Sequence, residues 1–119
     1  MILHITTRNE WDQAQTAGEY KAPSLQTDGF IHCSTINQTA ETANMFFKGR
    51  KDLILLCIDE NKLKAECRYE APCCQEMHNK TAENLFPHIY GPIDLTAIVN
   101  VVDLNPGEEG LFELPTNLK

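Results

Sequence analysis

The chain has no excess of basic residues and no long apolar run, and both absences narrow its function. Its 119 residues include 10 Lys and Arg against 17 Asp and Glu, a formal net charge of −7. Such a chain repels a phosphate backbone, so we do not expect duplex nucleic acid as a partner. No apolar segment approaches the ~20 residues of a membrane-spanning helix, so we expect no membrane partner either.

We also expect no secretory leader, because the sequence enters a strand-like run, Ile2–Ile5, almost at once. We therefore expect a cytoplasmic location. The five cysteines are odd in number, which suits reduced thiols rather than a disulfide framework. The sequence has no His-Glu-x-x-His motif, and the spacing of its cysteines does not suit structural zinc. No metal site is predicted. The alternative ligand sets would be Cys67, Cys73, Cys74 and His78, or His32 with Cys33.

The chain does contain enough apolar material for one domain, since 42% of its residues are hydrophobic. We expect a single domain over residues 1–119, with a core at about 2–104 and a polar C-terminal tail at 105–119. A monomer is the favoured oligomeric state.

Capping signals predict two main helices. Thr7 and Glu10 form a capping box at the start of the first helix, which ends at Gly18. Thr35 and Gln38 form a second box, followed by apolar residues at helical spacing. The segment between the first helix and the second strand is predicted to be a loop.

Five runs are predicted to be strands: Ile2–Ile5, Gly29–Cys33, Leu53–Ile58, Ala65–Glu70 and Leu95–Leu104. A loop is expected at Ala71–Asn84. Phe86–Pro92 is predicted to be a loop or an edge strand, because Pro87 cannot donate to a central ladder. This order predicts an α+β fold, with the helices packed on a mixed or antiparallel sheet.

The stretch DGFIHCST, Asp28–Thr35, joins a strand to a helix, and side chains at such a junction are rigidly held and face open space. Free amides at the helix start could hold a phosphate, and Arg68 could add charge. Ser34 and Thr35 also suit helix capping. Ser34 and His32 lie two residues apart on one strand, so a hydrolase triad using Ser34 or Cys33 is not expected.

The four histidines allow different roles. His4 lies in an apolar strand, where a core ring bonded to a backbone carbonyl and a pocket-lining ring are equal alternatives. A structural role is favoured for His32 and a solvated one for His78. His88 lies in an apolar loop with less packing reason for an imidazole, which favours function.

Glu70 shares a strand face with Arg68, as a surface ion pair would. If that face lines a pocket, Glu70 could act as a base or stabilise a cationic centre. Tyr90 and Phe86 offer aromatic faces for a nucleobase or nicotinamide ring, with ordinary core packing as the alternative.

Four stretches together resemble a known family: ILHITTRNEW, DGFIHCST, RYE (Arg68–Glu70) and FPHIYGPI. They resemble domain-of-unknown-function family 952, a set of small, mostly bacterial proteins, from Ile2 to about Leu104. That family is similar in fold to the ADP-ribosyltransferase and RNA 2′-phosphotransferase group, which binds NAD or ADP-ribose-like ligands between two small sheets. The resemblance implies an ADP-ribosyltransferase-like domain with a split sheet, and it makes NAD the candidate cofactor.

The resemblance also implies roles for single residues. It places His4 like the first-strand histidine that contacts the ligand ribose in those enzymes, and Ser34 or Thr35 near their second motif. Their late-strand glutamate has no counterpart in this sequence, because Leu95–Leu104 offers only Asn100 and Asp103. Glu70 is the candidate substitute, by its position on a sheet rather than by motif.

The predicted function is the binding of a nucleotide or NAD-like small molecule, with ADP-ribosyl or related transfer as the expected activity. The expected catalytic residues are His4, Glu70 and His88. The expected ligand-binding residues are His32, Ser34, Thr35, Arg68 and Tyr90. Two alternatives stay open: a non-enzymatic module that binds a small ligand or a protein, and a reaction on another substrate with histidines as acid and base.

Overall fold

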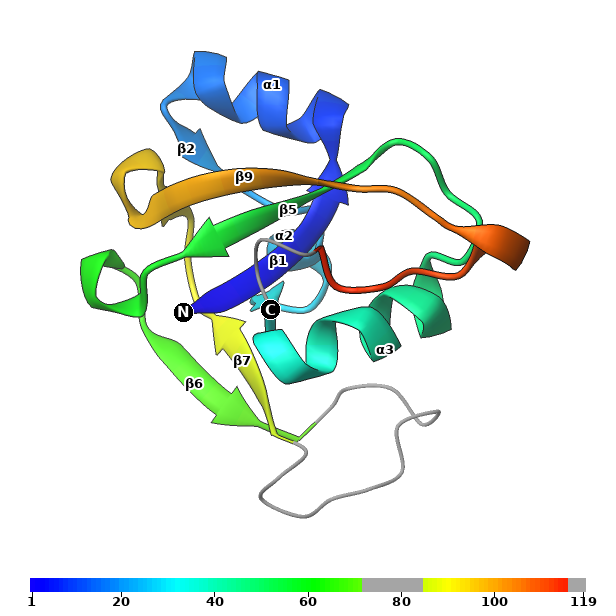
Figure 1. Cartoon of the computed structure of the whole chain (residues 1–119). Coiled ribbons are helices and arrows are strands. Elements are labelled where there is room, and N and C mark those ends of the chain that lie inside the picture. Colours follow the sequence, from blue (N-terminus) through cyan, green and yellow to red (C-terminus); the bar gives the residue numbers. More distant parts are fainter. Residues whose placement is uncertain (72–84, 116–119) are drawn as a thin grey trace.

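Three helices and three antiparallel sheets make up the part of the chain that the computed structural model describes, residues 1–71 and 85–115 (Figure 1). This is the α+β fold that the sequence predicts. Every pairing between described strands is antiparallel, and the strands fall into three sheets rather than the expected two.

The largest sheet has the order β4–β1–β5–β9, with bounds Ser34–Thr35, Ile2–Thr7, Leu53–Ile58 and Ile98–Leu104. Every residue of β5 is buried, as its unbroken apolar run predicts for a strand covered on both faces. One face of β5 packs toward the two smaller sheets through Ile54, Leu56 and Ile58. The other face packs toward the helix α3, Ile36–Phe46, through Leu53, Leu55 and Cys57.

The three-stranded sheet has the order β3–β7–β6, with bounds Ile31–His32, Phe86–Ile89 and Cys67–Glu70. The prediction of a loop or an edge strand at Phe86–Pro92 is wrong, because β7 is the central strand. Pro87 is tolerated there because β3 ends at His32, opposite His88. Pro87 has no N–H, and its position lies one residue past the end of the β3–β7 pairing, where that N–H is not needed. The carbonyl of Pro87 still accepts the N–H of Cys33 at 3.0 Å.

The predicted loop after the first helix contains two short elements, the strand β2, Glu19–Tyr20, and the helix α2, Ser24–Thr27. β2 pairs with β8, Ile93–Asp94. The predicted final strand therefore begins later than expected, since a 3-10 turn at Leu95–Ala97 separates β8 from β9. Strands of two residues are too short for alternation to reveal.

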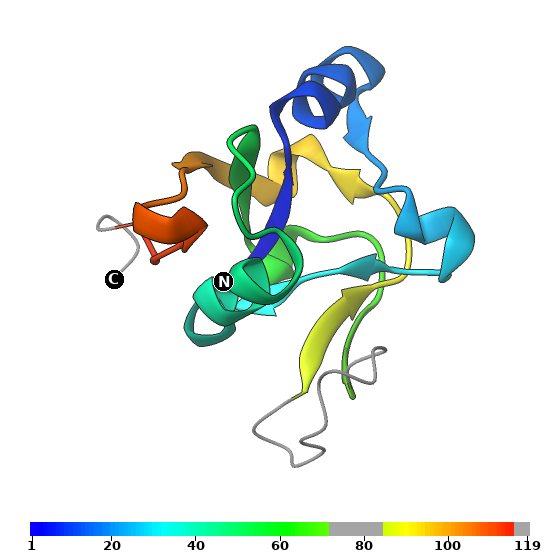
Figure 2. The same ribbon diagram turned by 90° about the vertical axis from the view of Figure 1, so that its right-hand side faces the viewer.

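Both main helices begin where the capping boxes predict. The helix α1, Arg8–Ala17, starts after Thr7, whose hydroxyl accepts the N–H of Glu10 at 3.1 Å, and it ends at left-handed Gly18. At the start of α3, the N–H of Thr35 donates to Oε1 of Gln38 at 2.9 Å. Figures 1 and 2 show α1 above the four-stranded sheet and α3 below it. None of the helices in the described ranges has the length and apolar character that a membrane crossing requires.

The segment expected to be a polar tail contributes to the core. Residues 105–115 return along α3 (Figure 1), and Phe112 is buried in the cluster around Leu3 and Ala43. The Asn44 side chain accepts the N–H of Phe112 at 2.6 Å and donates to its carbonyl at 3.1 Å. The core therefore extends past Leu104.

Candidate functional site

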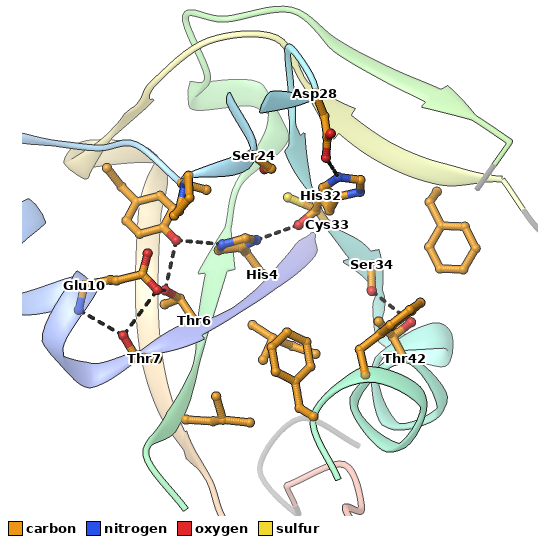
Figure 3. Close-up of a pocket in the computed structure, with 18 of the residues that line it drawn as sticks. His4, Thr6, Thr7, Glu10, Ser24, Asp28, His32, Cys33, Ser34 and Thr42 are labelled. Atoms are coloured by element: carbon orange, nitrogen blue, oxygen red, sulfur yellow. Dashed lines mark hydrogen bonds and ion pairs between the residues drawn. The ribbon is translucent and has the colours of Figure 1, made fainter. Parts of the chain in front are cut away.

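A cavity of about 420 Å³ opens between β1, the segment from β3 to β4, the C-terminal half of α3, and β7 (Figure 3). Four predicted site residues line it: His4, His32, Ser34 and His88. Alternation along β1 and β7 and the pairing of His32 with His88 bring these side chains to one space. The two histidine-bearing stretches, DGFIHCST and FPHIYGP, therefore meet as neighbouring strands.

Three other predicted residues reach the cavity only through His88. Arg68 lies opposite His88 on β6, Glu70 bonds the His88 ring, and Tyr90 bonds Glu70, but none of the three lines the cavity. Thr35 caps α3 and also lies outside the lining.

Both ring nitrogens of His4 are already bonded. Nδ1 lies 2.6 Å from the carbonyl oxygen of His32, and Nε2 lies 2.8 Å from the hydroxyl of Tyr20. Because a carbonyl only accepts, Nδ1 carries the proton, and Nε2 of the neutral ring accepts. Burial lowers the pKa of His4 to about 4, so the ring is neutral at neutral pH. Both alternatives for His4 thus hold together: it is a core ring bonded to a carbonyl, and it lines the cavity.

The Tyr20 hydroxyl continues this hydrogen bonding toward α1. It lies 2.9 Å from Oγ1 of Thr6, which lies 3.3 Å from Oε1 of Glu10 (Figure 3). Sequence reasoning missed Tyr20 and Thr6 and treated Glu10 only as a capping residue. The alternation of His4 and Thr6 on one strand face could have indicated Thr6, whereas Tyr20 lay in a predicted loop.

His88 is held by a carboxylate. Its Nδ1 lies 2.9 Å from Oε1 of Glu70, so Nδ1–H donates and Nε2 of the neutral ring is left as an acceptor. Burial lowers the pKa of His88, and the bond to Glu70 opposes that shift. The ring of Phe30 stacks on His88 with centroids 4.0 Å apart. No described residue forms a hydrogen bond with Nε2, which remains a base on a buried, oriented ring.

Glu70 receives two donors on one oxygen. Besides His88, the hydroxyl of Tyr90 donates to Oε1, and these bonds lower the pKa of the Glu70 carboxyl. The Arg68 guanidinium lies over the Tyr90 ring, 4.8 Å from its centroid, and also pairs with Glu66. Within the described ranges, Oε2 of Glu70 has no hydrogen bond.

His32 lies at the cavity edge, where its Nε2 meets Oδ2 of Asp28 at 2.8 Å. Its ring is edge-on to that of His88, with centroids 5.5 Å apart. Ser34 Oγ donates to the hydroxyl of Thr42 at 3.4 Å. Burial raises the pKa of the Cys33 thiol, which keeps it protonated. The geometry offers neither Ser34 nor Cys33 as an activated nucleophile.

The end of α3 adds residues that the sequence did not indicate. Phe46 and Phe47 contribute aromatic wall, and Arg50 contributes a cation that also pairs with Asp52. Among the described residues, no group of three or more His, Cys, Asp or Glu side chains is placed to hold a metal ion. Cys73, Cys74 and His78 lie outside the described residues.

A family model described as "Protein of unknown function (DUF952)" matches residues 5–101. The chain belongs to the DUF952 family. The resemblance predicted from the four stretches is therefore confirmed. The DUF952 match includes His32, Ser34, Glu70 and His88, and it begins one residue after His4.

Solved structures of one protein have a similar fold. The crystal structure of protein CC0527 from Caulobacter crescentus has a TM-score of 0.82 and 30% identity, covering 98% of this chain and 96% of that one. The solution NMR structure of CC0527 has a TM-score of 0.76 and 31% identity, covering 95% and 91%. No curated protein matches the chain.

Proposed function

We propose that the cavity binds a nucleotide or NAD-like ligand, and that Glu70 and His88 act in a transfer from that ligand. The observation that carries the proposal is the Glu70–His88 pair beside the cavity, with Oε2 of one and Nε2 of the other unbonded among the described residues. Perturbed pKa values in a cleft are typical of reacting groups, and both members of this pair have them.

The cavity suits such a ligand in size and chemistry. Its volume of about 420 Å³ lies within the range of roughly 300–1,000 Å³ for small-molecule sites. Phe46, Phe47 and Phe86 give a nucleobase an aromatic wall, and Arg50 gives a phosphate group a cation. An ADP-ribosyltransferase-like arrangement, part of this proposal, would account for a ligand site between a four-stranded and a three-stranded sheet.

In the proposed reaction Glu70 stabilises the cationic sugar that forms as the base leaves, because its Oε2 is open while Oε1 is fixed by two donors. His88 takes the proton of the incoming nucleophile at Nε2. Tyr90 lies outside the cavity lining, with Arg68 and Phe30 against its ring, so a departing base would meet it only after passing His88. His4 acts through Tyr20, because neither of its nitrogens is open to a ribose.

One observation favours the second candidate, a binding module without chemistry. Asn100 and Asp103, the late-strand residues that could replace the missing glutamate, are exposed and do not line the cavity. Asp103 instead pairs with Arg8. If Glu70 does not take the role of that glutamate, the cavity binds its ligand without reacting with it.

NMR spectra recorded with millimolar NAD, ADP-ribose or inorganic phosphate test the binding. We expect shifts at His4, Ser34 and His88, and no shift at any of them would contradict the ligand class. NAD consumption over hours tests the transfer, and binding without consumption favours the module. His88→Ala should abolish turnover while Asn100→Ala, outside the cavity, leaves it unchanged.

The proposal includes a cytoplasmic location and a monomeric state. The described cysteines Cys33, Cys57 and Cys67 are all free, which supports a reducing compartment.

A further inference from the structure

Four contacts in series connect the His32 carbonyl to the carboxyl group of Glu10 (Figure 3). They join His32 O to His4 Nδ1 at 2.6 Å, His4 Nε2 to the Tyr20 hydroxyl at 2.8 Å, and that hydroxyl to Thr6 Oγ1 at 2.9 Å. The last joins Thr6 Oγ1 to Glu10 Oε1 at 3.3 Å. The three middle side chains are at most 7% exposed, whereas Glu10 is partly exposed.

The number of protons in this chain of contacts is one fewer than the number of contacts. A neutral His4, Tyr20 and Thr6 supply three protons, and a Glu10 carboxylate supplies none. The carbonyl fixes the His4 proton on Nδ1, so in the neutral ring Nε2 takes the proton of Tyr20 and Tyr20 accepts that of Thr6. The opposite order, with Tyr20 donating to Thr6 and Thr6 donating to Glu10, belongs to a ring that also carries a proton on Nε2. The contact left without a proton is the longest, between Thr6 and Glu10.

We propose that His4, Tyr20, Thr6 and Glu10 form a relay that moves one proton between the Glu10 carboxyl group and Nε2 of His4. A proton from solvent first binds Glu10 and fills the open contact. The O–H bonds of Glu10, Thr6 and Tyr20 then break, and new bonds form at Thr6 Oγ1, Tyr20 Oη and His4 Nε2. Glu10 becomes a carboxylate, His4 becomes an imidazolium, and no other charge changes.

The relay ends inside the cavity, because all four side chains line it. The proton that reaches Nε2 leaves by the same bonds, because both nitrogens of His4 are occupied, so the relay sets the charge of a ring in the cavity wall whatever the ligand's identity. Tyr20, Thr6 and Glu10 are thus positioning residues for His4: they determine whether Nε2 of its ring gains a second proton.

Other titratable groups near the relay have separate partners or remain neutral. From β3, the His32 ring faces His4 and pairs with Asp28. The Cys33 thiol near Tyr20 is kept protonated by burial. Residue Leu56 of β5, opposite His4, cannot titrate. Arg50, on the same cavity wall, pairs with Asp52. Glu10 is therefore the carboxylate connected to His4 by hydrogen bonds.

¹⁵N NMR of the full chain tests the relay without any ligand. At pH 7 we expect His4 as the Nδ1–H tautomer, with a slowly exchanging Tyr20 hydroxyl proton coupled to Nε2. On titration, Tyr20→Phe and Thr6→Val should lower the pKa of His4 by about one unit, because the charged ring loses its connected acceptors. Glu10→Gln should lower it by about half a unit through the lost charge.

Two controls separate a relay from general effects. Thr6→Ser keeps the hydroxyl, so His4 should titrate as in the wild type. Glu19→Gln removes a carboxylate that is not part of the relay and should leave the pKa of His4 unchanged. The proposal is overturned if the Tyr20 proton is not coupled to Nε2, or if Thr6→Val and Thr6→Ser titrate alike. An equal effect of Glu19→Gln and Glu10→Gln would also overturn it, because bulk charge would then explain both. If Tyr20→Phe fails to fold, the two Thr6 variants carry the same test.

Discussion

His4 and His88 line the same cavity, yet different partners hold them. His4 is bonded to a carbonyl and a hydroxyl, so both nitrogens are occupied by neutral groups. His88 is bonded on one side to the carboxylate of Glu70. Burial is the largest cause of the lowered pKa of each ring, but only His88 has a carboxylate opposing it.

Burial alone therefore does not assign a histidine its role. His4 is part of the frame, because its bonds connect β1, β2 and β3. His88 is oriented by one bond and presents its second nitrogen to a ligand.

Acidification should destabilise the protein mainly through His4. Its pKa is about 4 in the folded chain against 6.5 ordinarily, so the unfolded chain binds the extra proton between these values. The free energy of unfolding should therefore fall by up to about 3 kcal/mol as the pH drops through this window. Urea unfolding between pH 7 and pH 4 measures it. His4→Leu should remove most of the slope, and a slope retained in that variant would assign it to other groups.

Replacing His4 should destabilise the protein at pH 7 as well. His4→Leu leaves the His32 carbonyl and the buried Tyr20 hydroxyl without this partner, at a cost of about 2 kcal/mol. Urea denaturation at pH 7 gives the value. If His4→Leu lowered the free energy of unfolding by less than His88→Leu does, His88 and not His4 would be the structural histidine.

The corresponding change at His88 should cost less stability. His88→Leu keeps apolar volume against Phe30, and the freed carboxylate of Glu70, 36% exposed, turns to water. We expect a loss of about 1 kcal/mol or less in the free energy of unfolding. Thermal and urea unfolding should agree, and a loss above 3 kcal/mol would make His88 a frame residue too.

The smallest expected effect concerns titration of His88. Glu70→Gln removes the carboxylate that raises the pKa of His88 against burial, so that pKa should fall by about half a unit. NMR titration of the ring measures the shift. Glu66, four residues before Glu70, pairs with Arg68 and not with His88. Glu66→Gln is therefore the matched control and should leave the pKa of His88 unchanged.

Local sequence was sufficient for the parts of the fold that depend on neighbouring residues. The boxes at Thr7 and Thr35 predicted both main helix starts, and the apolar run Leu53–Ile58 predicted the most buried strand. A cap needs residues three apart and a strand buried on both faces needs only apolar side chains, so neither depends on distant contacts. The family resemblance also followed from sequence alone.

Tertiary structure decided what those elements do together. Pro87 occupies a central strand because β3 stops opposite His88, and Phe112 packs into the core beside Asn44, which bonds its backbone. His4 could be classed only once Tyr20, sixteen residues away, was seen on its second nitrogen. Sequence determined which residues carry imidazole and carboxyl groups and which local elements hold them. Strand register and long-range hydrogen bonds, which no local pattern encodes, decided which nitrogen remains open to the cavity.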